Sequence, residues 1–202
     1  AEYIFERAEA VSGFSELAEG ETSVSIFASY MQIYKEHLQD LLASDPTASD
    51  LNVRRDPKEG VFVQGLSERL LLDVRDLAAL IEQGNRKRTV ASTLMNAHSS
   101  RSHALVIIRV EQEISLHEHA RVKRKIVSRV NLVDLAGSER ASKSGAKGET
   151  LQEAIAINQS LSALGNVINA LTDPVQRRNA AHIPYRSSKL THLLEPSLGG
   201  NS

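Results

Sequence analysis

Two short segments of the chain combine residue types that bind cations and phosphate oxygens. Residues 96–103 read Asn-Ala-His-Ser-Ser-Arg-Ser-His and supply three serine hydroxyls and one planar guanidinium. Residues 134–139 read Asp-Leu-Ala-Gly-Ser-Glu and follow an apolar run typical of a strand. A carboxylate at a strand end, as at Asp134, can hold Mg²⁺ through water, and the N–H of Gly137 can approach a phosphate because glycine has no Cβ. The two segments therefore indicate the sensing loops of a nucleotide-driven switch.

Each segment also has a simpler interpretation. Many strands end in aspartate and many turns use glycine, so Asp-x-x-Gly alone also fits an ordinary turn. The serine-rich segment also fits a helix start that is capped by serine. In the functional interpretation, Glu139 is a partner for the guanidinium of Arg101.

Length and composition are those of a globular protein. The 202 residues are 41% hydrophobic and 24% charged, which suits a single domain over residues 1–202 with a sizeable core. No apolar run is long enough to cross a bilayer, and the first residues do not resemble a signal peptide. There are no cysteines, so disulfides and thiolate metal sites are excluded. We expect a cytoplasmic protein with no membrane partner.

Charge is distributed unevenly along the chain. Residues 1–50 hold ten acidic side chains against two basic ones, whereas the remainder holds 22 basic against 15 acidic. A basic half suits an acidic partner such as nucleic acid, anionic lipid or an acidic protein surface, although scattered solvated side chains explain it equally well. Residues 121–129 carry five basic residues and no acid. We interpret them as a solvated hairpin face and expect no nucleic-acid binding, because aromatic stacking partners are missing.

Hydrophobic spacing predicts alternating strands and helices. We expect strands over residues 22–34, 104–111 and 126–133, and a hairpin over residues 51–66. We expect a helical turn over residues 36–42, a helix over residues 73–83 that Gly84 ends, and helices over residues 149–171 and 187–194. This alternation favours a layered α/β fold, although the strand order cannot be derived from it.

Four motifs resemble those of kinesin motor domains, and they occur in the order of that family. They are Asn-x-x-Ser-Ser-Arg-Ser-His at 96–103, Asp-Leu-Ala-Gly-Ser-Glu at 134–139, Asn-Gln-Ser-Leu-Ser-Ala-Leu-Gly-Asn at 158–166 and Pro-Tyr-Arg-Ser-Ser-Lys-Leu-Thr at 184–191. Myosins share a related first motif, but Ser138 and the Ser-His pair at 102–103 favour kinesin. The resemblance implies a three-layer P-loop NTPase motor fold with a central mixed sheet flanked by helices, and a microtubule-dependent ATPase with ATP and Mg²⁺.

The resemblance also implies roles for individual residues. Arg101 and Glu139 resemble the salt bridge that closes the two switch loops, and together with Ser100 and Gly137 they form the implied catalytic set. The implied nucleotide-binding residues are Asn96, Ser99, Ser100, Asp134 and Gly137. Ser100 and Asp134 are the implied Mg²⁺ residues, the latter through water. In phosphoryl transfer such groups act by positioning and by stabilising charge.

Basic residues near the resembling loops and helices are the implied microtubule contacts. They are Arg140, Lys143, Lys147, Arg177, Arg178, Arg186 and Lys189. Two positions depart from the family pattern, because Gln159 and His192 stand where many relatives have a basic residue. We therefore expect a weaker contact at Gln159.

The phosphate-binding loop of the family is absent from these 202 residues. No Gly-x-x-x-x-Gly-Lys-Ser/Thr occurs, and no glycine is followed by lysine. We therefore expect the chain to be the C-terminal part of a motor domain, truncated at both ends and without the P-loop segment and neck linker, with oligomerisation encoded elsewhere. The rival hypotheses are a non-motile microtubule-binding module without ATPase activity and a structural scaffold. The segment His117-Glu118-His119 and the pair His98 and His103 could suggest a metal site. We interpret these histidines as surface or hydrogen-bonded core residues, because no cysteine or acidic cluster lies beside them.

Overall fold

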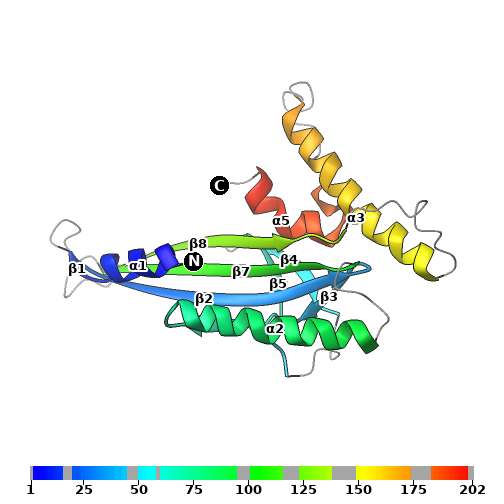
Figure 1. Cartoon of the computed structure of the whole chain (residues 1–202). Coiled ribbons are helices and arrows are strands. Elements are labelled where there is room, and N and C mark those ends of the chain that lie inside the picture. The colour runs from blue at the N-terminus through cyan, green and yellow to red at the C-terminus, as the bar shows by residue number, and fades with distance from the viewer. Residues whose placement is uncertain are drawn as a thin grey trace.

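Three long antiparallel strands form the centre of the molecule. The computed structural model describes residues 2–15, 20–44, 50–57, 60–94, 101–115, 123–137, 149–173 and 183–199. Strands β2 (Gly20–Tyr34), β7 (His103–Ser115) and β8 (Lys123–Asp134) lie side by side along most of their length (Figure 1). Their β-branched and aromatic residues favour the extended conformation of a strand.

Shorter strands complete this sheet along β2. β1 (Gly13–Ser15), β6 (Arg69–Leu71) and β3 (His37–Asp40) pair, in this order, with successive parts of β2. β4 (Asn52–Asp56) pairs with β5 (Gly60–Gln64) in a separate hairpin. Every pairing among the described strands is antiparallel. A parallel component of the expected mixed sheet is thus not found in the described part of the chain.

Helices cover both faces of the sheet (Figure 1). α1 (Glu2–Val11) and α2 (Val74–Leu94) pack on one face, where Tyr30, Val106 and Leu80 belong to one buried cluster. On the other face, α5 (Lys189–Gly199) and the β4–β5 hairpin cover Met31 and Leu105. α3 (Glu149–Thr172) packs on α5 and on the short 3₁₀ helix η3 (Tyr185–Ser187). No helix in the described ranges is both long enough and apolar enough to cross a membrane.

Most elements expected from the sequence are confirmed. The strands expected at 22–34, 104–111 and 126–133, the hairpin within 51–66 and the helix at 149–171 are all present, and the last helix extends to Gly199. The exposed basic residues of the 123–129 stretch lie on β8, as the hairpin interpretation predicts.

The helical turn expected over residues 36–42 is wrong. The chain instead reverses at Lys35 and Glu36, which both have positive φ (49° and 63°), and continues as β3. Consecutive residues with positive φ form the turn whose twist suits a tight hairpin. The carboxylate of Asp40 then accepts hydrogen bonds from the N–H groups of Leu42 and Ser67, which fixes the chain after β3.

The helix end expected at Gly84 is also wrong, because α2 continues to Leu94. A Cβ built on Gly84 would lie 2.1 Å from Cδ1 of Tyr30 on β2. The glycine therefore permits close packing of the helix on the sheet and does not end the helix.

Replacing Gly84 by alanine is expected to destabilise the fold by about 2 kcal/mol, because the clash with the ring of Tyr30 outweighs the better helix propensity of alanine. Gly165 in α3 is the matched control, since no atom lies within 4 Å of a Cβ built there. The change Gly165→Ala is expected to stabilise the fold by about 0.5–1 kcal/mol. Urea unfolding of both variants measures the difference, and equal effects would contradict this packing role.

Candidate functional site

The sheet register brings the two candidate loops together. Asp134, the last residue of β8, pairs with Ala104 at the start of β7. Residues 101–103 lead directly into β7, so they lie next to residues 134–137. The long antiparallel pairing thus places a strand end and a strand start at the same edge, as a phosphate-sensing site requires.

Arg88 connects the two segments from α2. Its guanidinium donates to the carboxylate of Asp134 (2.8 Å), to the carbonyl of Ser102 (2.7 Å) and to Ser102 Oγ (3.3 Å). The Arg88 side chain is 10% exposed, whereas that of Asp134 is 70% exposed. The buried cation therefore orients a carboxylate that is still open to solvent.

His103 makes the second connection. Its Nδ1 accepts a hydrogen bond from the backbone N–H of Ala136 (3.0 Å), and its Nε2 lies 2.7 Å from Ser160 Oγ on α3. Ser160 Oγ in turn donates to the carbonyl of Ile157 (2.7 Å). His103 is 2% exposed and Ser160 is 3% exposed, so water does not compete for these bonds.

The partners determine which ring nitrogen of His103 carries the proton. A backbone N–H can only donate and a carbonyl can only accept, so Nδ1 must offer its lone pair and Ser160 must give its proton to Ile157. The neutral ring therefore carries its hydrogen on Nε2 and donates it to Ser160. Burial, followed by the positive charge of Arg88, holds the pKa of His103 below its ordinary value, and Asp134 opposes this effect.

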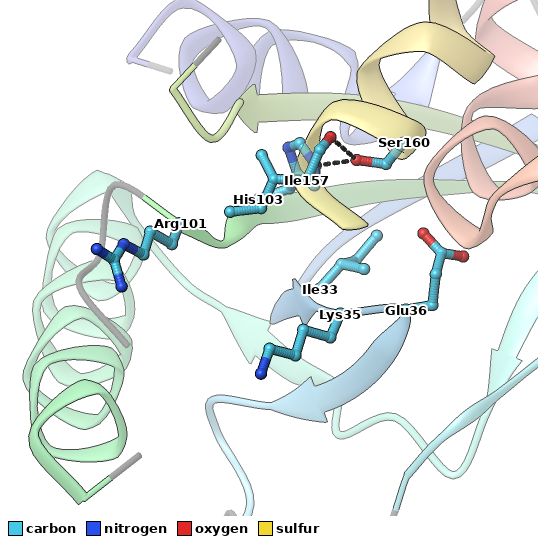
Figure 2. A pocket seen from close by; sticks show the side chains of 7 residues that line it. All are labelled: Ile33, Lys35, Glu36, Arg101, His103, Ile157 and Ser160. Atoms are coloured by element: carbon cyan, nitrogen blue, oxygen red, sulfur yellow. Dashed lines mark hydrogen bonds between the residues drawn. The ribbon is translucent and has the colours of Figure 1, made fainter. Parts of the chain in front are cut away.

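A small hollow lies next to this chain of hydrogen bonds (Figure 2). It is formed by the ends of β2 and β7 and by α3, and its lining residues are Ile33, Lys35, Glu36, Arg101, His103, Ile157 and Ser160. Figure 2 shows the side chain of Arg101 directed away from the ring of His103, towards α2. Arg101 is partly exposed, while the next two residues are buried and hydrogen-bonded.

The stability of the fold is expected to fall as the pH is lowered below about 6.5, the ordinary pKa of the ring of His103. The lowered pKa means that the unfolded chain binds this proton at a higher pH than the folded chain, so acid favours unfolding. Each proton contributes at most about 1.4 kcal/mol per pH unit. Unfolding measured between pH 7.5 and 5.5 should show a shallower slope in His103→Gln. A slope unchanged in this variant would contradict the assignment, since the pKa of His192 is also lowered by burial and remains in both proteins.

The other predicted site residues are only partly described. Arg101, Asp134 and Gly137 lie together at the edge formed by β7 and β8, and Gly137 follows the hydrogen-bonded Ala136. The remaining predicted residues lie outside the described residues: Asn96, Ser99, Ser100, Glu139, Arg140, Lys143, Lys147, Arg177 and Arg178.

The described basic residues of the predicted microtubule surface differ in their surroundings. Arg186 on η3 is exposed. The ammonium of Lys189, at the start of α5, donates to Asp50 (2.9 Å), and its backbone N–H donates to Glu36 (2.7 Å). Lys189 therefore also joins α5 to the turn between β2 and β3.

The two positions that depart from the resembling pattern are both described. Gln159 is exposed on α3, where a basic residue would have been accessible. His192 lies on α5, and its Nε2 is buried without a hydrogen-bond partner among the described residues.

One of the two predicted Mg²⁺ residues, Asp134, is described and fits an ion held through water. Asp134 offers a solvent-exposed carboxylate at the strand end, and oxygen is the ligand that Mg²⁺ prefers. No group of three or more acidic, histidine or cysteine side chains that could hold a metal occurs in the part of the chain that the structure describes. Asp134 could therefore hold such an ion through water.

Sequence reasoning missed Arg88 and the partner of His103. Arg88 continues the apolar stripe of Leu77, Ile81 and Gly84 at helical spacing, so a helix continued past Gly84 would have placed it on the buried face. His103 is confirmed as a hydrogen-bonded core residue. Its partner Ser160 is 57 residues away, and no local pattern connects the two.

Comparisons with known proteins show the family of the chain. A family profile described as "Kinesin motor domain" matches residues 1–202. The chain is 48% identical over 174 residues to the human chromosome-associated kinesin KIF4B, covering 86% of the chain and 14% of that protein. It is 46% identical over 188 residues to kinesin-related protein 5 of Dictyostelium discoideum, covering 93% of the chain and 18% of that protein. The chain thus spans less than a fifth of the length of these relatives.

Solved structures share the fold. A fast kinesin matches with a TM-score of 0.78 and 40% identity, covering 98% of this chain and 51% of that one. A KIF14 dimer with AMP-PNP in complex with a microtubule matches with a TM-score of 0.78 and 37% identity, covering 100% of this chain and 54% of that one. This agreement confirms the expected α/β fold with helices on both faces of a sheet.

Proposed function

Because the chain belongs to the kinesin motor-domain family, we propose that it forms the phosphate-sensing and microtubule-binding part of an ATP-hydrolysing motor. The observation that carries the proposal is the double connection between the two loops. Arg88 binds both Ser102 and Asp134, and His103 binds the N–H of Ala136. A nucleotide phosphate that moved one loop would therefore disturb the other.

The proposed roles in catalysis are those that the resemblance to the family implies. Asp134 and Gly137 respond to the terminal phosphate, while Arg101 and Glu139 pair to close the loops and place the attacking water. Asn96, Ser99 and Ser100 contact nucleotide. Ser100 and Asp134, the latter through water, would hold a Mg²⁺ ion, which would neutralise phosphate charge. The protein residues act by positioning and by charge, which are the main terms in phosphoryl transfer.

The partner is the microtubule. The similarity to a kinesin solved in complex with a microtubule supports this partner, and the exposed Arg186 supports a basic contact near η3 and α5. Such a contact depends on salt, because exposed charges are screened by ions. This function places the protein on cytoplasmic microtubules.

The edge of the sheet supports a motor domain that needs further residues. β8 pairs with β7 on one side, and Val127, Val130 and Leu132 on β8 are exposed. Exposed apolar residues on an edge strand favour pairing with another segment. The 202-residue chain alone, which has no P-loop sequence, is therefore expected to be inactive as an ATPase.

Nucleotide titration tests the proposal. The 202-residue chain is expected to bind ATP weakly or not at all, whereas the full-length protein is expected to hydrolyse ATP faster in the presence of microtubules. Micromolar affinity in the isolated chain would contradict the need for further residues. The alternative, a non-motile microtubule-binding module, predicts microtubule co-sedimentation of the full-length protein without ATP turnover. A scaffold predicts neither.

Replacing Arg186 by alanine in the full-length protein is expected to weaken microtubule binding about threefold at low salt, since one exposed charge contributes less than 1 kcal/mol. Co-sedimentation at increasing salt measures this change, and the difference should shrink as salt rises. Arg124→Ala is the control, because Arg124 is exposed on β8, away from this surface. An equal loss in both variants would show a general charge effect instead of a contact at Arg186.

A further inference from the structure

We propose that His103 is a positioning residue that couples the loop after β8 to helix α3, so that displacement of this loop changes how the helix is held. The coupling runs from the Ala136 N–H through the ring of His103 to Ser160 and the carbonyl of Ile157. It rests on the proposed function, because the displacement would come from a nucleotide phosphate near Asp134 and Gly137.

The geometry fixes the donor-to-acceptor direction of every hydrogen bond between Ala136 and Ile157. Each bond has one possible donor, so the ring cannot turn over or exchange its nitrogens without breaking contacts on both sides. Its backbone pairs with Ile33 of β2, which fixes the residue at the start of β7. The ring therefore touches a loop on one side and a helix on the other from a rigid base.

Burial makes the two bonds depend on each other. His103 and Ser160 are almost completely buried, so a group that loses its partner here does not regain one from water. If the N–H of Ala136 moves away, Nδ1 is left without its donor, and the arrangement that favours the Nε2–H bond to Ser160 is lost. The positions of the loop and of the helix are then linked energetically, which is what coupling between two sites requires.

The position of Ser160 gives the coupling a function. Ser160 belongs to the motif at 158–166 on α3, one of the four motifs that resemble those of kinesins, and it lies next to the exposed Gln159, where a microtubule contact is expected. The His103–Ser160 bond joins this part of α3 directly to the first residue of β7. A change at the phosphate would thus reach the surface that binds microtubules.

The test compares microtubule affinity of the full-length protein in ADP and in a non-hydrolysable ATP analogue. His103→Asn places an amide oxygen near the position of Nδ1 but cannot reach Ser160, and Ser160→Ala removes the same bond from the other side. Each variant is expected to reduce the ratio of the two microtubule Kd values at least threefold, while nucleotide Kd stays within about twofold. The double variant is expected to be no worse than either single one, because both changes break one bond. Ser162→Ala, at an exposed position on α3, is the matched control and is expected to leave the ratio unchanged.

The outcomes separate the coupling from the proposed function. If the wild-type ratio is large and both variants keep it, the coupling is overturned and the motor function stands. If the wild-type protein shows no dependence on nucleotide, the proposed function fails and the coupling fails with it. If His103 and Ser160 only stabilised the fold, both variants would weaken microtubule binding equally in the two nucleotide states. The ratio of the two microtubule Kd values would then stay unchanged, which also overturns the coupling. If His103→Asn does not fold, Ser160→Ala decides alone.

A spectroscopic measurement on the 202-residue chain checks the hydrogen-bond chain itself. Nitrogen NMR of His103 is expected to show a neutral ring with its proton on Nε2. The Ala136 amide is expected to exchange with solvent at least tenfold faster in His103→Ala than in the wild type. A proton on Nδ1, or an unchanged exchange rate, would contradict the geometry on which the coupling depends.

Discussion

Replacing Arg88 by alanine is expected to lower the free energy of unfolding by about 3 kcal/mol. The guanidinium is buried and donates to the carbonyl and hydroxyl of Ser102 and to Asp134, so its removal leaves the Ser102 carbonyl buried without these bonds. The aliphatic part of the side chain also loses its packing. Asp134 contributes less to this loss, because it is exposed and water can replace its partner. Urea unfolding near pH 7.5 measures the change.

The same helix provides a matched control. Arg86 is two residues earlier and pairs with Glu82 one turn away, but both side chains are more than two-thirds exposed. Arg86→Ala is therefore expected to change the free energy of unfolding by less than about 0.5 kcal/mol. Arg88→Lys should lie between the two, because lysine keeps the charge but not the planar group that reaches both Ser102 and Asp134. Similar effects of the two alanine variants would show that Arg88 does not bridge the two segments.

Arg88 also illustrates what local sequence could predict. Apolar and β-branched runs identified β2, β7 and β8, because such residues favour the extended conformation of a strand. The end of α2 was misplaced, since a glycine was taken as a stop signal when it allows contact with Tyr30, 54 residues earlier in the chain. The continued helix carries Arg88, so this one error also hid a residue of the candidate site.

The turn before β3 is a feature that local sequence rules could not predict. Tight hairpins with two positive φ angles usually use asparagine and glycine, but this chain uses Lys35 and Glu36. The carboxylate of Glu36 accepts the N–H of Lys189 at the start of α5, which no local pattern can indicate. The motifs that carry the candidate chemistry were identifiable from sequence. The buried groups that position them, His103 with Ser160 among them, depend on contacts between distant segments.

Replacing Arg101 by alanine in the full-length protein is expected to lower the rate of ATP hydrolysis at least about 100-fold, because the pair that closes the two loops and places the attacking water is lost. Arg101 is two residues before His103, and Glu139 is three residues after Ala136. The hydrogen bond between His103 and Ala136 brings the segment that follows Arg101 next to the segment that precedes Glu139 in the sequence. Steady-state ATPase assays with microtubules measure the loss.

Nucleotide affinity distinguishes this role from a structural one. Arg101 is partly exposed and precedes the buried pair Ser102 and His103, so its truncation should leave the fold and the nucleotide Kd nearly unchanged. Glu139→Ala should give the same defect, and the exchanged pair Arg101→Glu with Glu139→Arg should recover part of the activity, because the attraction is then restored in reverse. If each single variant kept wild-type turnover, closure of the loops would not depend on this pair. The contacts of Arg88 and His103 would then have to hold the loops together by themselves.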